Sequence, residues 1–449
     1  MKNTTKLILF TLTTLVLFLP MAQEHFKLFK FRKLTGVVAE AQQPEITFSN
    51  YTNHSLQTWT ESHLKLNYGL REPLTRLYNQ YMWDFYRHSN LLEKDPEKEN
   101  TKKMYMGDDG WLVETPYVEE YYMGKGRWYA SDSLGMAKYF SQEALRLYQL
   151  QKILEKEGTQ LFVLLLPGKE LIYPEHIPET DDFPKDKDFS LWEFYGKKFK
   201  EMGINHVDIG QWFIEMKDTV DYPLFPQTGT HWSNYAALHV ADSLVRYMEQ
   251  LGDLKMEHFT IGEREERTVM PDDDLEQLMN LARPLPKIPN YYAPYTVIED
   301  STASKPMLIT IGDSYYWNLL NATPFGKLMG CLRYWYYFST VYFDYGHNNI
   351  KEVDVMKEVL DADFVMLSYS TAQLYRMSQG FSQQLLVELC CDEEDLAAAT
   401  QEVAESLNIG DEDARKLVMQ NPGRYIPALR DSIPTKRSQK FMQYHGIQQ

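Results

Sequence analysis

Residues 161–166 form the run Leu-Phe-Val-Leu-Leu-Leu, which is continuous in apolar residues. A strand with one face in water alternates polar and apolar residues, whereas a parallel strand covered on both faces is apolar throughout. The run follows a segment from Ser141 to Gly158 in which leucines recur at helical spacing. The sequence therefore predicts a helix followed by a buried parallel strand.

The same alternation of helices and strands continues along the chain. Further strands are expected at Asn205–Ile209, Met307–Ile311 and Asp363–Tyr369, and a helix with a regular apolar face is expected after His231. Helices alternating with strands indicate an α/β fold, with a parallel sheet between two layers of helices. Residues 253–300 are predicted to be an insertion, since they are rich in charges and prolines.

The strand at Met307–Ile311 runs directly into Gly312-Asp313-Ser314. In open α/β sheets, ligands bind in the crevice beyond the carboxyl ends of the strands. A serine at this position is therefore a candidate nucleophile. The tripeptide alone is weak evidence, because a chain of this length contains it by chance about one time in ten.

A serine hydroxyl becomes a good nucleophile when a neighbouring base removes its proton, and imidazole has a suitable pKa near neutral pH. His231 lies in a loop rich in turn-forming residues, at the entry to the helix that follows. It is the candidate base for Ser314. The alternative is a surface or capping histidine, which is the commoner role of an isolated histidine in a sequence.

Several motifs together resemble a known family. They are Gly312-Asp313-Ser314, Thr230-His231-Trp232, Gly107–Leu112, Pro167-Gly168-Lys169, Tyr173-Pro174-Glu175 and Asn67–Arg71, spread over residues 45–380. In this order they resemble the SGNH-hydrolase-like proteins of bacterial polysaccharide O-acetylation, of the AlgX/AlgJ type. The resemblance implies a flavodoxin-like α/β fold and acetyl transfer to sugar hydroxyls outside the cytoplasm, beside a membrane-bound O-acyltransferase as partner. It also implies a place at the inner membrane, facing the periplasm.

The chain departs from this family at one position. The family has an aspartate two residues before its catalytic histidine, and here that position is Gly229. A carboxylate holds the imidazole in the useful tautomer, and its loss costs several orders of magnitude in a serine–histidine system. The candidate replacements are Asp221, Asp208 and Asp313. The alternative is a protein that binds its target without catalysis.

The amino terminus carries an apolar segment, Leu7–Leu19, preceded by Lys2 and Lys6. Its length is below the roughly 20 residues of a comfortable membrane span. It predicts either an uncleaved signal anchor or a cleaved secretory peptide. Basic residues occur on both sides of it, so charge gives little information about orientation.

Composition restricts the classes of partner. The formal net charge of −17 argues against a general nucleic-acid binder, whose affinity depends on neutralising phosphates. The three cysteines cannot build a disulfide framework, and no group of His and Cys has the spacing of a metal site. We therefore expect neither a metal nor a cofactor.

Aromatic residues make up 14% of the chain, and they gather after Ser314. Aromatic faces suit sugar rings, although most such residues pack in cores. The candidates for substrate contact are Tyr369, Arg333, Trp232 and Tyr315. For Arg333 and Tyr369 the choice follows the resemblance, which implies an arginine and a tyrosine downstream of the serine in the substrate cleft.

The expected organisation has four parts: residues 1–22 as signal anchor or signal peptide, 23–45 as juxtamembrane linker, 46–381 as the SGNH-hydrolase-like acyltransferase domain, and 382–449 as a helical carboxyl-terminal extension. The extension is either a solvated appendage or a docking module. The expected function is acyl transfer to a cell-surface polysaccharide. The alternatives are an acetyl esterase, a D-alanyl transferase and a non-catalytic scaffold subunit.

Overall fold

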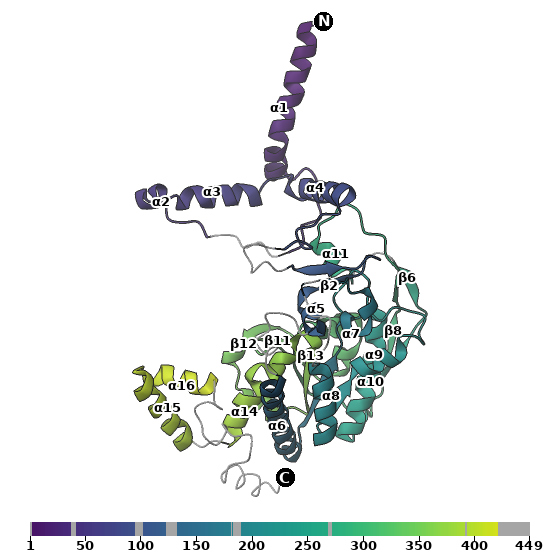
Figure 1. Cartoon of the computed structure of the whole chain (residues 1–449), viewed down its shortest axis with the longest axis vertical. Helices are drawn as coiled ribbons and strands as arrows, with labels where there is room; N and C mark the ends of the chain where they lie inside the picture. The colour runs from purple at the N-terminus through teal and green to yellow at the C-terminus, as the bar shows by residue number, and fades with distance from the viewer. Residues whose placement is uncertain are drawn as a thin grey trace. The chain divides into compact units, whose positions relative to one another are not determined.

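The computed structural model describes residues 2–36, 42–94, 102–122, 133–180, 182, 190–267, 272–390 and 393–420. The chain divides into two compact units (Figure 1). Unit 1 comprises Met1–Tyr105 and Asp273–Lys287, and unit 2 comprises Met106–Asp272 and Ile288–Gln449. The four predicted domain boundaries remain predictions, and parts of the predicted linker (37–41) and extension (391–392 and 421–449) lie outside the described residues.

Unit 1 is helical in its described residues. Its helices are α1 (Lys2–Phe26), α2 (Phe48–Thr52), α3 (Ser55–Leu66), α4 (Arg71–Tyr86) and α11 (Asp274–Leu278). The predicted apolar segment lies inside α1, which continues through Pro20. Residues Thr4–Phe26, which contain an 18-residue window with a mean hydropathy of 1.8, are long and apolar enough to cross a membrane by length and composition.

A seven-stranded sheet lies at the centre of unit 2, in the order β12-β11-β10-β9-β13-β3-β4. Its strands are β3 (Gln160–Leu166), β4 (His206–Asp208), β9 (Leu308–Gly312), β10 (Leu332–Tyr336), β11 (Thr340–Phe343), β12 (Gly346–Asn349) and β13 (Phe364–Ser370). The five strands from β10 to β4 in this order are parallel.

The parallel sheet is confirmed, and each of the four predicted strands is present within two residues of its expected bounds. Two features differ from expectation. The antiparallel strands β11 and β12 extend the sheet at one edge, so the sheet is mixed. The helix predicted from Ser141 begins earlier, because α6 runs from Ser133 to Glu157 and Ser141 lies in its interior.

Helices cover both faces of the sheet (Figure 1). On one face, α6, α8 (Leu191–Met202), α13 (Val355–Leu360) and α14 (Phe381–Cys390) share a core with β3, β9 and β13. On the other face, α9 (Ile209–Met216), α10 (Asn234–Gly252) and α12 (Tyr315–Ala322) pack against the sheet and one another. This double cover explains why β3 and β13 are apolar on both sides.

Short elements complete unit 2. The predicted insertion forms two small antiparallel pairs, β5 (His258–Ile261) with β8 (Tyr295–Ile298) and β6 (Glu265–Arg267) with β7 (Asn290–Tyr292). The remaining elements before the C-terminal helices are β1 (Met104–Met106), β2 (Leu112–Glu114), α5 (Thr115–Tyr122), α7 (Lys169–Ile172), η1 (Pro174–His176), η2 (Phe325–Leu328), η3 (Ile350–Glu352) and η4 (Thr371–Gly380).

The predicted C-terminal helices are present as α15 (Glu393–Leu407) and α16 (Asp411–Gln420). They share a small core of their own with Val387 of α14. Three acidic residues occupy the first turn of α16, where the helix dipole favours negative charge.

Candidate active site

Ser314 lies at the carboxyl end of β9 and caps the start of α12. Two residues before Ser314, only glycine fits. A β-carbon on Gly312 would overlap the carbonyl oxygen of Ser368 in β13. This close approach lets the chain turn between the two strands. The half-buried Ser314 hydroxyl is thereby placed at the carboxyl edge of the sheet, as its position after a core strand predicted.

Asp313 holds this turn to the neighbouring strand. Its buried carboxylate accepts hydrogen bonds from the backbone N–H of Ser370 (2.7 Å), the hydroxyl of Ser370 (2.6 Å) and the backbone N–H of Tyr315 (3.2 Å). Burial raises the pKa of Asp313, and these hydrogen bonds and the charge of His231 act against that rise. The aspartate of the Gly-Asp-Ser motif therefore fixes the backbone on both sides of the serine.

His231 lies in the loop before α10, as predicted. The helix begins after Ser233, whose hydroxyl caps the backbone N–H of Ala236, and Ser233 N–H donates to the Leu224 carbonyl. This fixed loop brings His231 Nε2 to 2.9 Å from Ser314 Oγ. The two candidate residues, 83 positions apart in sequence, are thus within hydrogen-bond distance, and both are half-buried.

The other sequence motifs hold this loop in place. The buried Lys169 ammonium donates to the carbonyl oxygens of Leu112 (2.8 Å) and Gln227 (3.2 Å), which joins three motif regions. Immediately before His231, the Thr230 hydroxyl donates to Glu114 (2.9 Å). Glu114 is a carboxylate near the histidine that sequence reasoning missed, although it closely follows the Gly107–Leu112 motif.

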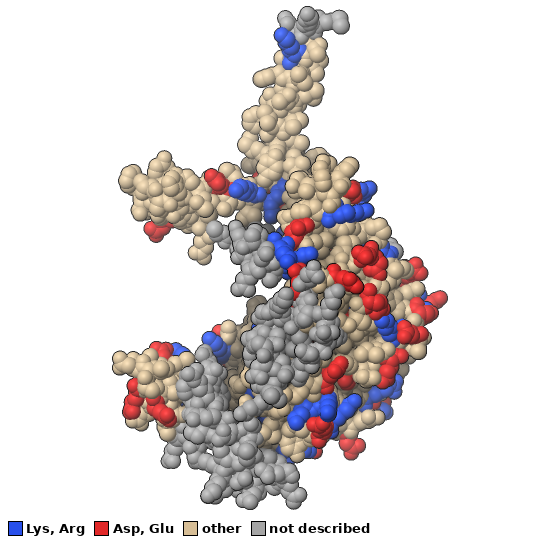
Figure 2. Space-filling view, in the orientation of Figure 1, with Lys and Arg blue, Asp and Glu red and all other residues tan. Residues whose placement is uncertain are grey.

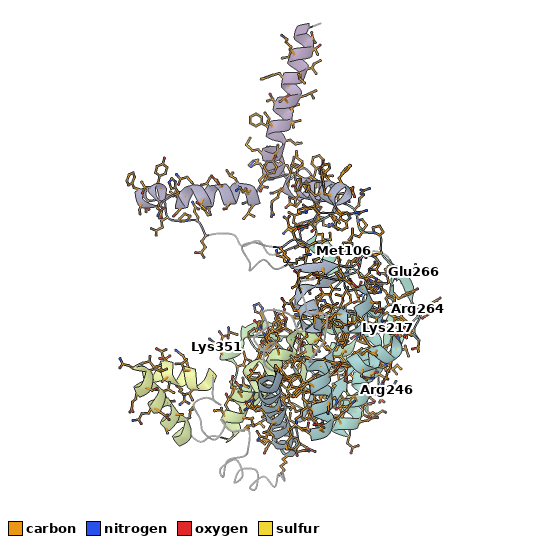
Figure 3. The ribbon with its side chains drawn as sticks, in the orientation of Figure 1. Met106, Lys217, Arg246, Arg264, Glu266 and Lys351 are labelled. Atoms are coloured by element: carbon orange, nitrogen blue, oxygen red, sulfur yellow. The ribbon has the colours of Figure 1, made fainter. Side chains whose placement is uncertain are left out.

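The three candidate carboxylates have different surroundings. Asp221 is exposed and accepts two hydrogen bonds from Arg264, which lower its pKa (Figure 3 labels Arg264). Asp208 caps α9 and accepts from the Trp192 indole at 2.9 Å. Asp313 alone of the three is adjacent to Ser314 in the turn. The structure thus ties Asp221 and Asp208 to other partners, and an orienting role for any carboxylate remains a prediction.

The four residues expected to contact substrate differ in position and burial, and their contact with a substrate stays a prediction. Arg333 pairs with Ile309, toward the amino end of β9, and its guanidinium binds Glu358 at 3.1 Å. Strand register therefore carries it away from the Ser314 edge. Tyr369, Trp232 and Tyr315 are fully buried, so they are packing residues in the described structure.

Two of these buried rings nevertheless support the histidine. The Tyr315 hydroxyl donates to the Thr230 carbonyl at 3.1 Å, and its ring lies edge-on to the His231 ring at 4.8 Å between centroids. Trp232 packs edge-on to Tyr315 from behind, at 5.8 Å. Their contribution is to fix the position of His231.

Tyr337 is a site residue that sequence reasoning missed. It lies in the turn between β10 and β11, where both Tyr337 and Phe338 have positive φ values, 50° and 47°. Bulky residues seldom adopt this conformation, and such strain tends to persist at functional sites. The Tyr337 N–H donates to the Gly312 carbonyl at 2.9 Å, and its phenol is close enough to Ser314 for the serine side chain to lower the pKa of the phenol.

The electrostatics keep the Tyr337 phenol protonated. Burial raises its pKa, the charge of Asp313 raises it further, and the neighbouring Ser314 side chain partly opposes both. A neutral phenol can donate to the serine oxygen or to an oxygen bound beside it. The only sequence signal for Tyr337 is its place in the aromatic run 334–338, which does not distinguish it from its neighbours.

We expect Tyr337→Phe to lower kcat for turnover of an aryl acetate by about 10- to 100-fold, since it removes a neutral phenol hydroxyl beside the candidate nucleophile, where it could donate to a developing oxyanion. KM and the thermal unfolding midpoint are expected to stay near those of the parent protein, because the ring is retained. The matched control is Tyr345→Phe, at an 82% exposed tyrosine in the turn between β11 and β12, at the other end of the strands. Equal kcat values for the two variants would exclude a role for the Tyr337 hydroxyl.

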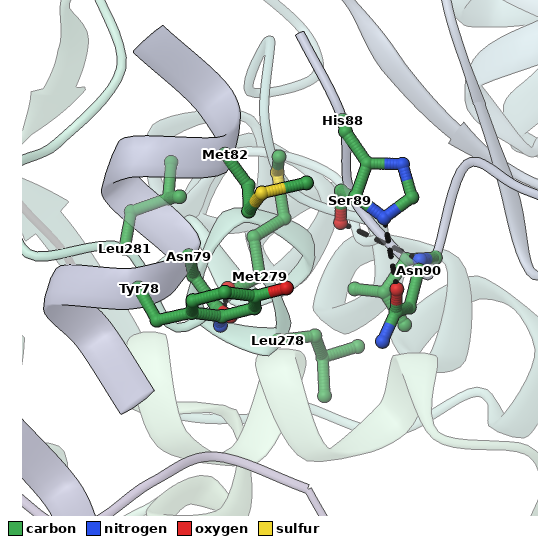
Figure 4. A pocket seen from close by; sticks show the side chains of 10 residues that line it. Tyr78, Asn79, Met82, His88, Ser89, Asn90, Leu278, Met279 and Leu281 are labelled. Atoms are coloured by element: carbon green, nitrogen blue, oxygen red, sulfur yellow. Dashed lines mark hydrogen bonds between the residues drawn. The ribbon is translucent and has the colours of Figure 1, made fainter. Parts of the chain in front are cut away.

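A pocket of about 220 Å³ lies within unit 1 and shares no residue with this site. Figure 4 shows it between α4 and residues 278–281, with Tyr78, Met82 and Met279 in its wall and a hydrogen bond between His88 and Asn90. Its volume is below the roughly 300–1,000 Å³ usual for small-molecule sites. We assign it no ligand.

Comparison with known proteins supports the resemblance. Residues 105–316 match the family model described as the SGNH hydrolase-like domain of the acetyltransferase AlgX. The match contains both His231 and Ser314 but neither Arg333 nor Tyr369. The probable alginate O-acetylase AlgJ of Pseudomonas aeruginosa is 27% identical over 165 residues, which are 36% of this chain and 38% of that protein. The chain thus matches less than half the length of this relative.

Solved structures with a similar arrangement include the O-acetyltransferase domain of Pseudomonas putida AlgJ, which is 16% identical with a TM-score of 0.40 and covers 63% of this chain and 98% of that one. Pseudomonas aeruginosa AlgX is 12% identical with a TM-score of 0.41, covering 66% and 72%. Bacillus cereus PatB1 with a sulfonyl adduct is 10% identical with a TM-score of 0.35, covering 60% and 95%.

Proposed function

We propose that the SGNH hydrolase-like domain of the AlgX type, which residues 105–316 carry, transfers an acyl group, acetyl in the first instance, to hydroxyls of an extracytoplasmic polysaccharide. The observation that carries this proposal is the distance of 2.9 Å between His231 Nε2 and Ser314 Oγ at the carboxyl edge of the sheet. An acyl-serine mechanism requires at least a base and a hydroxyl at this distance.

In the first half-reaction, the serine is acylated. His231 Nε2 takes the proton of Ser314 Oγ as that oxygen attacks the acyl carbonyl of the donor, and the same proton then passes to the leaving group. The ester bond of the donor breaks as the acyl-serine ester forms. The backbone N–H of Ser314, at the start of α12, and the Tyr337 phenol are the groups that we propose stabilise the developing oxyanion.

In the second half-reaction, the acyl group passes to the sugar and the free serine hydroxyl is regenerated. A sugar hydroxyl gives its proton to His231 and attacks the acyl-serine carbonyl, and the proton is then passed to Ser314 Oγ as the ester to serine breaks. Water in place of the sugar gives hydrolysis by the same steps, so transferase and esterase differ in how well water is excluded.

The acyl donor has to come from across the membrane in an extracytoplasmic setting. We propose that a membrane-bound O-acyltransferase supplies it, and that α1 holds the protein at the inner membrane with unit 2 in the periplasm. The similarity to the probable alginate O-acetylase AlgJ of Pseudomonas aeruginosa supports a polysaccharide acceptor. The apolar composition of Thr4–Phe26 supports a membrane location.

A non-catalytic scaffold subunit is the second candidate, and Gly229 is the observation that favours it. This buried glycine stands where the family resemblance places an orienting aspartate. A scaffold is expected to bind polysaccharide without ever carrying an acyl group on Ser314, which separates the two functions experimentally.

The test is to locate the acyl group. The full chain in detergent is incubated with an aryl acetate, and peptide mass spectrometry identifies the acetylated residue. We expect the acetyl group on Ser314, its transfer to an acetyl-free polysaccharide added afterwards, and unchanged labelling in the control Ser339→Ala, at an exposed serine beside Tyr337. Polysaccharide binding without acetyl-Ser314 would overturn the enzymatic proposal in favour of the scaffold.

A further inference from the structure

Helix α4 carries an apolar face that the described structure leaves open to solvent. Its residues recur at intervals of one to four positions and are between 48% and 73% exposed. We call this set the α4 apolar face: Leu74, Leu77, Tyr78, Tyr81 and Phe85. A soluble helix normally turns such a stripe toward a core. Here the stripe points outward and therefore needs a different environment.

The opposite face of α4 is fixed, so this orientation is a property of the fold. Arg76 is buried and donates to the carbonyl oxygens of Lys33 (2.7 Å) and Leu281 (3.4 Å). The Asn79 amide donates to the Met279 carbonyl at 2.9 Å. Arg76, Asn79 and the buried Trp83 thus hold α4 to the rest of unit 1. The α4 apolar face remains largely exposed, although Tyr78 also borders the pocket beside residues 278–281.

The α4 apolar face lies next to the base of α1. A β-carbon on Gly69, just before α4, would overlap the Pro20 carbonyl, so the end of α1 packs directly on the turn into α4. Within unit 1, Figure 1 shows α1 extending from the level of α4 on the side away from α11. Figure 2 shows a long uncharged stretch of α1 below the basic atoms near its upper end.

The composition of this region matches the boundary between lipid headgroups and acyl chains. Tyrosine and other aromatic rings are enriched at this depth, because the ring is apolar and the hydroxyl is polar. Exposed cations flank the region, namely Lys27, Lys30, Lys33 and Arg87, and they suit anionic headgroups. Helices of this kind lie in the plane of the interface.

We propose that the α4 apolar face lies in the headgroup–acyl boundary of a phospholipid bilayer, beside a membrane-spanning α1. The protein then contacts the membrane at two places, one helix that spans it and one that lies on it. Two attachments restrict how unit 1 can tilt and rotate, whereas a single spanning helix leaves both free. The proposal does not depend on Ser314 chemistry.

The test uses the full chain in vesicles of phosphatidylcholine and phosphatidylglycerol that contain a diazirine-bearing phospholipid. After irradiation, mass spectrometry maps the lipid-linked peptides. We expect adducts within 71–86 as well as in α1. The double variant Leu77→Glu/Tyr81→Glu is expected to lose about 90% of the α4 adducts, because two charges at the interface cost about 1.4 kcal/mol, a factor of ten.

Adducts in α1 serve as the internal standard, since α1 holds both proteins in the vesicles. The matched control is Ile298→Glu, which puts the same charge at an apolar residue that is 51% exposed, in unit 2, and it is expected to leave the α4 adducts unchanged. Adducts confined to α1, equal α4 adducts in the double variant, or α4 cross-linked to a second copy in place of lipid would each overturn the proposal. A circular dichroism spectrum equal to that of the parent protein shows that the double variant keeps its helices.

Discussion

Replacement of Ser314 by alanine is expected to lower kcat/KM for aryl acetate hydrolysis by at least about a thousandfold. The reason is specific to this residue: its oxygen forms the covalent bond to the acyl group, and no other group can take its place while His231 remains the base. The side chain is small and half-buried, so the thermal unfolding midpoint is expected to stay within about 2 °C of the parent value, the change that less than 1 kcal/mol produces in a large domain.

The measurement is steady-state hydrolysis by the full chain, with Ser339→Ala as the control. That serine is exposed and lies in the turn that carries Tyr337, so it tests for general effects of a serine-to-alanine change near the site. A loss of less than tenfold in Ser314→Ala, with Ser339→Ala at the parent level, would show that another residue carries the acyl group or that water attacks directly.

Replacement of His231 by alanine is expected to lower the same rate by about a thousandfold and to make it sensitive to added imidazole. Removing the ring leaves a space 2.9 Å from Ser314 Oγ that is partly open to solvent, and free imidazole can enter it and act as the base. Rescue of this kind distinguishes a missing base from a damaged fold, because a damaged fold is not repaired by a small molecule.

The control for this experiment is His239→Ala, in α10, the helix that His231 precedes. The His239 ring packs against Tyr222 and Tyr235. We expect His239→Ala to keep most of the activity and to show no response to imidazole. If imidazole accelerates the parent protein and His231→Ala by the same factor, the histidine is not the base for Ser314.

The sequence predicted the site best where local rules determine it. A run of apolar residues that ends in Gly-Asp-Ser places the serine at a strand end, and a turn-rich loop before a regular apolar helix places His231 at the helix entry. The pairing of Ser314 with His231 followed from the chemistry that a serine needs. Each of these inferences uses neighbouring residues only.

The positions of the predicted substrate-contact residues depend on strand register and burial, which the sequence does not show. Arg333 is in the aromatic run after Ser314, but its pairing with Ile309 places it away from the serine. Trp232 and Tyr369 are adjacent to promising positions, yet the double cover of the sheet buries them. Tyr337 was missed because its position near Ser314 depends on a backbone conformation with positive φ. No pattern of residue types predicts that conformation for a tyrosine.

The central position of β13 has a consequence for how the protein is made. This strand lies between β9 and β3 in the sheet, although it is the last of the sheet strands in the chain, and its Ser370 holds Asp313. Until residue 370 has been synthesised and delivered to the folding compartment, β3 and β9 have no strand between them and the turn before Ser314 has no anchor. Contacts that join such distant segments form slowly. The proposed catalytic pair is therefore assembled late, so an incompletely delivered chain is expected to lack the proposed acyl transfer.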